Sequence, residues 1–277
     1  MLLEIQHHLQ FTYDEFIRES HMEVRVEPRS QGGQIVHDFR LALGPSTMVT
    51  RYEDWLGNAI HWFSITDYHE RIELIAQSVV DTTMPSGPVL DLKDPMPTGT
   101  PGVDLYDFTL FTGPVLCSEA LDALHADLGL GKAGSLGDCM RLLGDGLAER
   151  FEYRKNITSF DSTTDYFIET GAGVCQDFAH LGLALLRRSF VPSRYVSGYL
   201  HVETQDIEPS QSHAWIEFYA IHQGWGLSER SMSDPYARNL LGLVIFRQTR
   251  QGSVRIMFVH QEGFVEAIAE QWASEVG

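Results

Sequence analysis

Cysteine is scarce in this sequence. Only three occur, Cys117, Cys139 and Cys175, in a chain of 277 residues. Their odd number and long, irregular gaps argue against a disulfide framework, and no pair has the Cys-x-x-Cys spacing of a structural zinc site. We therefore expect free thiols and no bound metal.

Positive charge and long apolar runs are also in short supply. The chain has 20 Lys and Arg against 38 Asp and Glu, a formal net charge of −18, and its basic residues are scattered. Such a chain is poorly suited to a phosphate backbone, so we expect no nucleic-acid partner. The opening residues MLLEIQHHLQ lack the pattern of a signal peptide, and no later run is apolar for long enough to cross a bilayer. The sequence predicts a cytoplasmic protein without a membrane partner.

The chain has enough apolar residues for a real core, since 43% are hydrophobic and 21% are charged. Residues 1–83 alternate apolar and polar side chains with the period of a half-buried strand, most clearly in HMEVRVE at 21–27. Gly57-Asn58 separates two such runs and has the residues of a hairpin turn. We predict an N-terminal antiparallel β-sandwich over residues 1–83.

A stretch rich in proline and glycine, residues 84–102, reads as a linker to a second domain at 103–277. There the apolar period becomes helical, with Leu136, Met140, Leu143, Leu147 and Phe151 on one face behind a capping box of Ser135 and Asp138. Cys139 lies in this predicted helix, and we expect Cys139 and Cys117 to be buried core thiols.

Cys175 stands apart from the other two thiols. Glycines precede it in GAGVCQDF, a long apolar run follows, and Arg187-Arg188 closes that run, as at the two ends of a buried helix. A thiol at a helix start feels the positive end of the helix dipole, which predicts a lowered pKa, and unpaired backbone N–H groups there can hold an oxyanion. A lone cysteine at a helix start is more often a small buried apolar residue, so a partner decides between the two interpretations.

His213 is that partner. It opens a predicted strand in which Ala214, Ile216 and Phe218 share the core face, so His213 lies on the opposite face. A lone histidine there would be a surface or structural residue. With Cys175 upstream it is a candidate general base.

These residues carry a family resemblance. The stretches GVCQDFAHLGLALLRRSFVPSRYVSGYLH and SHAWIEFY, with Gly224-Trp225, resemble the transglutaminase-like superfamily, in particular its microbial two-domain members described as candidate cysteine proteases. Their N-terminal β domain has a motif like Asp54-Trp55-Leu56-Gly57-Asn58. The resemblance implies a papain-like α+β core with Cys175 as nucleophile, His213 as base and an acidic residue that orients the histidine.

The acidic residue departs from the family pattern, in which an aspartate followed by proline comes four residues after Gly-Trp. Here that position is Glu229, followed by arginine, and an Asp-Pro pair comes five residues later at Asp234. We favour Glu229 as the orienting residue. Asp234, or no acidic residue at all, remains the alternative.

The function that follows is hydrolysis of peptide or carboxamide bonds through a thioester at Cys175, with a peptide or protein as substrate and no cofactor. Acyl transfer to an amine uses the same residues and stays open. So does a binding or scaffold protein whose site has decayed, because of the departure at Glu229.

Overall fold

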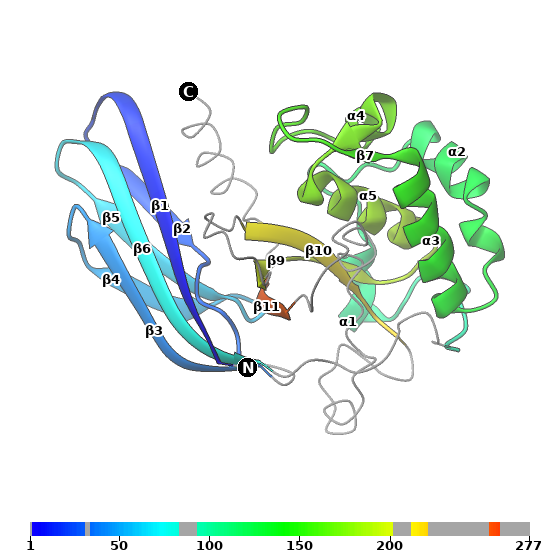
Figure 1. The fold of residues 1–277 in the computed structure, drawn as a ribbon, viewed down its shortest axis with the longest axis horizontal. Helices are drawn as coiled ribbons and strands as arrows, with labels where there is room; N and C mark the ends of the chain where they lie inside the picture. The colour runs from blue at the N-terminus through cyan, green and yellow to red at the C-terminus, as the bar shows by residue number, and fades with distance from the viewer. Residues whose placement is uncertain (1, 31–33, 83–92, 202–211, 221–254, 261–277) are drawn as a thin grey trace.

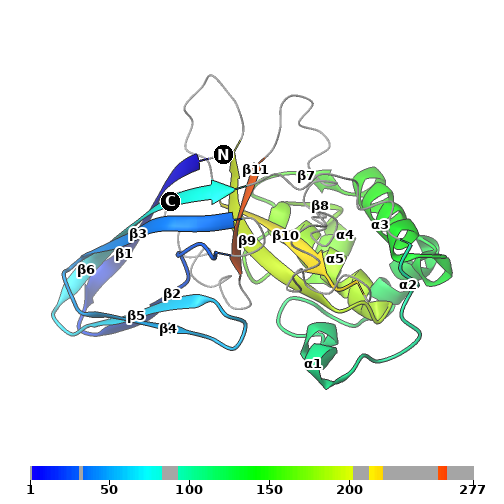
Figure 2. The ribbon, with the colours of Figure 1, turned by 90° about the horizontal axis from the view of Figure 1, so that it is seen from below.

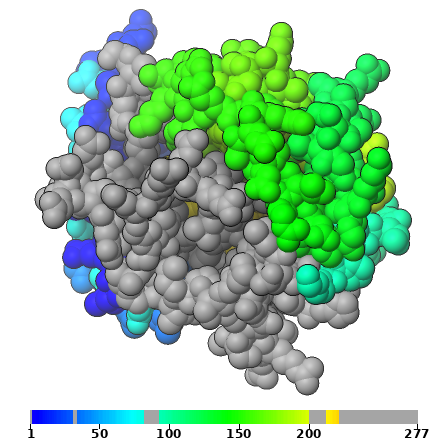
Figure 3. Space-filling view, turned by 45° about the vertical axis from the view of Figure 1, so that its right-hand side comes forward, coloured from blue at the N-terminus to red at the C-terminus, as the bar shows by residue number. Residues whose placement is uncertain are grey.

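The computed structural model describes residues 2–30, 34–82, 93–201, 212–220 and 255–260. The predicted α+β class is confirmed. Strands of the first 82 residues lie at one side, helices at the other, and a small sheet lies between them in both ribbon views (Figures 1 and 2). In the space-filling view the blue and cyan N-terminal residues and the green helical residues occupy opposite sides (Figure 3).

The N-terminal strands form two antiparallel sheets that share one core. The first has the order β1 (Leu2–Ile17), β6 (His69–Thr82), β3 (Gln34–Gly44), and the second β2 (Ser20–Val24), β5 (Ala59–Ile65), β4 (Val49–Glu53). Both sheets contribute buried side chains to this core, among them Leu9, Phe11, Ile72 and Leu74 from the first and Val24, Phe63 and Ile65 from the second. The alternation of apolar and polar residues along the strands therefore turns one face of each sheet toward this shared core.

Residues 103–188 are mainly helical, and α5 is the last helix of this segment. In chain order they are α1 (Val103–Tyr106), η2 (Asp107–Thr109), α2 (Glu119–Asp127), η3 (Leu130–Lys132), α3 (Leu136–Arg150), α4 (Thr164–Thr170) and α5 (Cys175–Arg188). The predicted cap of α3 is present, since Ser135 Oγ accepts from the backbone N–H of Asp138 at 3.1 Å. Two short strands, β7 (Glu152–Tyr153) and β8 (Ala172–Gly173), pair in parallel just before α5.

The central sheet has the antiparallel order β10 (Ser212–Phe218), β9 (Ser193–His201), β11 (Arg255–His260). Helix α5 packs on it, and both sides of that contact are apolar: Leu183 and Ala184 share a core with Ile216 and Phe218. Strand β11 overlaps residues 243–259, where the sequence suggests a C-terminal hairpin; the rest of that segment and the amphipathic run from Val265 to Val276 lie outside the described residues.

The two other thiols differ in burial. Cys139 is completely buried in α3, as predicted. The same prediction for Cys117 is wrong, because Cys117 is exposed. It lies in the connecting segment just before Ser118, the N-cap of α2, and such segments run over the surface.

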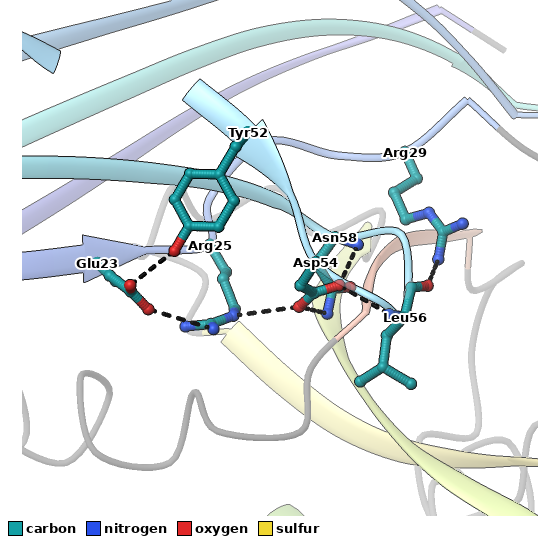
Figure 4. A network of polar contacts seen from close by, with 7 residues as sticks. All are labelled: Glu23, Arg25, Arg29, Tyr52, Asp54, Leu56 and Asn58. Atoms are coloured by element: carbon teal, nitrogen blue, oxygen red, sulfur yellow. Dashed lines mark hydrogen bonds and ion pairs between the residues drawn. The ribbon is translucent and has the colours of Figure 1, made fainter. Parts of the chain in front are cut away.

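A tight turn on the N-terminal domain faces the central sheet. The Asp54 carboxylate accepts from the backbone N–H groups of Leu56 and Asn58 at 3.0 and 2.8 Å, and Arg29 donates to the Leu56 carbonyl at 2.9 Å (Figure 4). Burial lowers the pKa of Arg29, and the charge of Arg194 on β9 lowers it further. Arg29 therefore lies close to the second domain, and the turn holds it there.

Gly57 makes this turn possible, and its replacement tests the arrangement. Its φ is +78°, and a Cβ there would lie 2.7 Å from Arg29 Nη2. We expect Gly57→Ala to lower the free energy of unfolding by about 1–3 kcal/mol, because alanine disfavours this backbone conformation and displaces Arg29. Gly99→Ala is the control, since nothing lies within 4 Å of that position. Equal urea midpoints for the two variants would contradict the role of the turn.

Candidate active site

Cys175 is the first residue of α5, as predicted, and a buried carboxylate fixes that start. Asp177 Oδ2 accepts from the backbone N–H of Val174 at 2.7 Å and from Thr158 Oγ1 at 2.6 Å. The first of these bonds is the backward half of a capping box. Gly173 leaves room for it, since a Cβ there would lie 2.5 Å from Asp177 Oδ2.

The strand that carries His213 begins against the Cys175 thiol. The sulfur accepts from the backbone N–H of Ala214, the residue after His213, and from that of Gln176. His213 pairs with Gly198 in the sheet, while Ala214 and Ile216 turn toward the apolar core of α5. The structure thus brings the cysteine and the residue next to the histidine together from segments almost forty residues apart in sequence.

The third predicted site residue, Glu229, and its alternative, Asp234, lie outside the described residues.

Within the described part of the chain, no group of three or more His, Cys, Asp or Glu side chains is placed to hold a metal ion. Among the described helices, none combines the length and apolar character needed to span a membrane.

The prediction of a lowered thiol pKa is wrong. Burial raises the pKa of Cys175 to about 11, and the N–H groups of Ala214 and Gln176 offset only part of that effect. The charge of Asp177 raises the pKa as well. Cys175 is only 7% exposed, so desolvation of a thiolate outweighs the stabilisation that a helix start provides.

His213 is shifted in the opposite direction. Burial lowers its pKa to about 4, and the positive charge of Lys155 contributes to the same shift. A base with a pKa of about 4 is unprotonated at pH 7. At pH 7 the described groups are therefore a neutral thiol and a neutral imidazole, rather than a thiolate and an imidazolium.

Sequence reasoning missed other residues that surround the thiol. Burial raises the pKa of Tyr153 on β7 and of the buried Tyr195 on β9. Both tyrosines lie near enough to Cys175 that a thiolate there would raise their pKa values further. The Tyr195 ring lies 5.3 Å from that of His180 on α5, and burial lowers the pKa of His180 to about 4. The alternation of Phe151 and Tyr153 was a signal for strand β7, but a two-residue strand is too short to be identified by period.

The titration of Cys175 gives a direct test. Below its pKa the thiolate fraction rises tenfold with each pH unit, so alkylation of Cys175 by iodoacetamide should accelerate almost tenfold per unit between pH 7 and 9. Mass mapping of the labelled peptides reads each thiol separately. Cys139, whose pKa burial raises to about 12, should be the slower of these two thiols. A rate that stays flat from pH 6 to 8 would instead show a preformed thiolate–imidazolium pair.

Comparison with known proteins agrees with this architecture. Residues 3–81 match the bacterial transglutaminase-like N-terminal region, and residues 131–227 match the transglutaminase-like superfamily. A solved structure from Cytophaga hutchinsonii, described as a candidate cysteine protease, is 22% identical with a TM-score of 0.59 and covers 80% of this chain and 77% of its own.

Two relatives extend the comparison in sequence. An uncharacterised protein of Mycobacterium tuberculosis is 28% identical over 232 residues, which are 79% of this chain and 74% of the relative. A protein-glutamine gamma-glutamyltransferase of Pseudomonas aeruginosa is 30% identical over 85 residues, which are 28% of this chain and 13% of that enzyme. The chain therefore contains a transglutaminase-like core at residues 131–227 and, ahead of that core, the N-terminal region of the bacterial members.

Proposed function

We propose that this protein is a cysteine-nucleophile hydrolase that acts on peptide or carboxamide bonds. The observation that carries the proposal is the position of Cys175 at the first turn of α5, with the backbone N–H of Ala214 on its sulfur. His213 is the residue before Ala214 in the strand that meets the thiol, which supports it as the base. A nucleophile at a helix start and a base on an adjacent strand are the parts that thioester chemistry requires.

The neutral state of both groups sets the order of proton transfers. His213 takes the proton as the Cys175 sulfur attacks the carbonyl carbon, and it then gives that proton to the leaving amine. Water, activated by His213, hydrolyses the thioester. We propose Glu229 as the residue that orients the imidazole. These steps use only side chains of the chain and water.

Acyl transfer is the second candidate. It is favoured by the 85-residue similarity to the Pseudomonas aeruginosa protein-glutamine gamma-glutamyltransferase. The polar sequence of residues 203–212 directly before His213 favours hydrolysis, because an enzyme that prefers amines must keep water from the thioester. The name of the Cytophaga hutchinsonii protein supports the same choice. The substrate class and the cytoplasmic location stay predictions.

The partition of the thioester distinguishes the two reactions. We expect the full chain to convert glutamine- or asparagine-containing peptides mainly to the free acid or to cleaved peptide, even with millimolar primary amine present, as read by mass spectrometry. Cys175→Ala should abolish the reaction, and Cys117→Ser, at an exposed thiol, should leave it unchanged. Amine conjugate in excess over acid would establish the transferase. No turnover of either kind, together with an inert Cys175, would favour the scaffold.

The identity of the acidic residue is tested by a pair of neutral substitutions. We expect Glu229→Gln to slow acylation of Cys175 by p-nitrophenyl acetate at least about tenfold, because the imidazole loses its orienting charge. Asp234→Asn is the matched variant and should have little effect. The reverse order would assign the role to Asp234, and two unchanged rates would show that no acidic residue at either position is needed.

A further inference from the structure

A loop of the second domain is fastened alongside the first turn of α5. At the start of this loop, strand β7 runs parallel to β8, and the Arg154 N–H donates to the Gly173 carbonyl at 2.8 Å. At its end, Thr158 Oγ1 donates to the Asp177 carboxylate at 2.6 Å. The two acceptors flank the nucleophile, one of them before it and the other after it in the sequence. Residues 155–157 therefore run alongside the nucleophile from one anchor to the other.

Further contacts fix the path of this loop. Gln176, the residue after the nucleophile, donates from Nε2 to the Ser159 carbonyl at 3.0 Å. Asn156 has a φ of 61°, in the left-handed region, and so turns the chain between the two anchors. The residue just before this turn is Lys155, which is exposed. A defined backbone thus carries a lysine at the edge of the site.

The charge of Lys155 is not balanced within this loop. Its neighbour Arg154 pairs with Glu152, and those two charges offset each other. Across the part of the chain that the structure describes, Lys155 itself forms no ion pair. The formal net charge of the whole chain is −18, so an uncompensated cation at the edge of the site is a local exception to its field. Such an ammonium is free to pair with a carboxylate that a substrate brings.

We propose that Lys155 determines substrate specificity by pairing with a carboxylate next to the carboxamide that Cys175 attacks. This inference rests on the proposed acyl chemistry and names its substrate class, which is acidic peptides. The carboxylate belongs to an Asp or Glu side chain or to a free C-terminus. Lysine suits this role because its flexible stem lets the ammonium follow the carboxylate of a bound peptide.

Pairing at Lys155 also acts on the base. The Lys155 charge contributes to the lowered pKa of His213. A substrate carboxylate that neutralises this charge raises the pKa of the imidazole again, because the imidazolium then has one positive neighbour fewer. An acidic peptide thus binds at the edge of the site and makes His213 a stronger base during attack. Its advantage should therefore appear in kcat as well as in KM.

Charge reversal at Lys155 tests this selectivity in the full chain. Acetylated and amidated peptides carry a central glutamine flanked by Glu, by Gln or by Lys, and kcat/KM is measured for each by mass spectrometry. We expect the wild-type protein to prefer the Glu peptide over the Gln peptide about fivefold at low salt, the upper range for an exposed ion pair, and less so as salt is added. Lys155→Gln should remove the preference, and Lys155→Glu should reverse it toward the Lys peptide. Lys132→Glu, at an exposed lysine on η3, is the matched control and should keep the wild-type order.

A ratio of rates within one variant separates specificity from stability. A purely structural role of Lys155 would lower the rates of all peptides together and leave their ratio unchanged. A further peptide, neutral except for a free C-terminal carboxylate close to the glutamine, distinguishes the two sources of the carboxylate. Preference for this peptide or for the Glu peptide, lost in Lys155→Gln, supports the proposal and identifies the group that is recognised.

Two other results would overturn the specificity alone. One is turnover by the wild-type protein without preference for a carboxylate, and the other is a preference that Lys155→Glu retains. Either result would leave the proposed function in place, because the peptides are still converted. Wild-type protein that converts none of these peptides would instead overturn the proposed function, and the specificity with it.

Discussion

The buried carboxylate of Asp177 fixes the point at which helix α5 begins, and the nucleophile depends on that point. The residue is 2% exposed, so removing its charge from water is costly. Its bonds to the Val174 N–H and to Thr158 are charge-assisted, and each contributes about 1.5–3 kcal/mol. The same two bonds tie the loop after β7 to the helix start. A single side chain thereby fixes the start of α5, where Cys175 lies, and ties the loop after β7 to it.

The strand of His213 is held from both faces. Ile216 packs in the core of α5, while on the other face Glu217 forms a buried ion pair with Arg194, with a closest N–O distance of 2.6 Å. Arg29 of the N-terminal domain lies near that pair. Breaking one partner of a buried pair costs about 3–5 kcal/mol, so this contact resists movement of β10. Arg29 thus brings the N-terminal domain close to the ion pair on β9 and β10.

Sequence patterns predicted what is local and periodic. The cap at Ser135, the turn at Gly57 and the start of α5 each depend on a few neighbouring residues with definite backbone preferences, and each is present. Exposure of Cys117 and the pKa of Cys175 were predicted wrongly, because both depend on tertiary packing. Tyr153 was missed for the same reason: its contact with Cys175 arises only when β7 pairs with β8.

The surroundings of His213 give a physical reason to propose an acidic partner for its imidazole. Burial and Lys155 together lower the pKa of the imidazole to about 4, which makes it a weak base for a thiol whose pKa burial raises to about 11. A carboxylate next to the ring would raise the pKa of His213 and stabilise the imidazolium that forms during attack. The described residues thus supply a physical reason for an acidic partner that does not depend on family resemblance. Because the effect of Lys155 opposes it, this carboxylate has to lie close to the ring to make His213 an effective base at neutral pH.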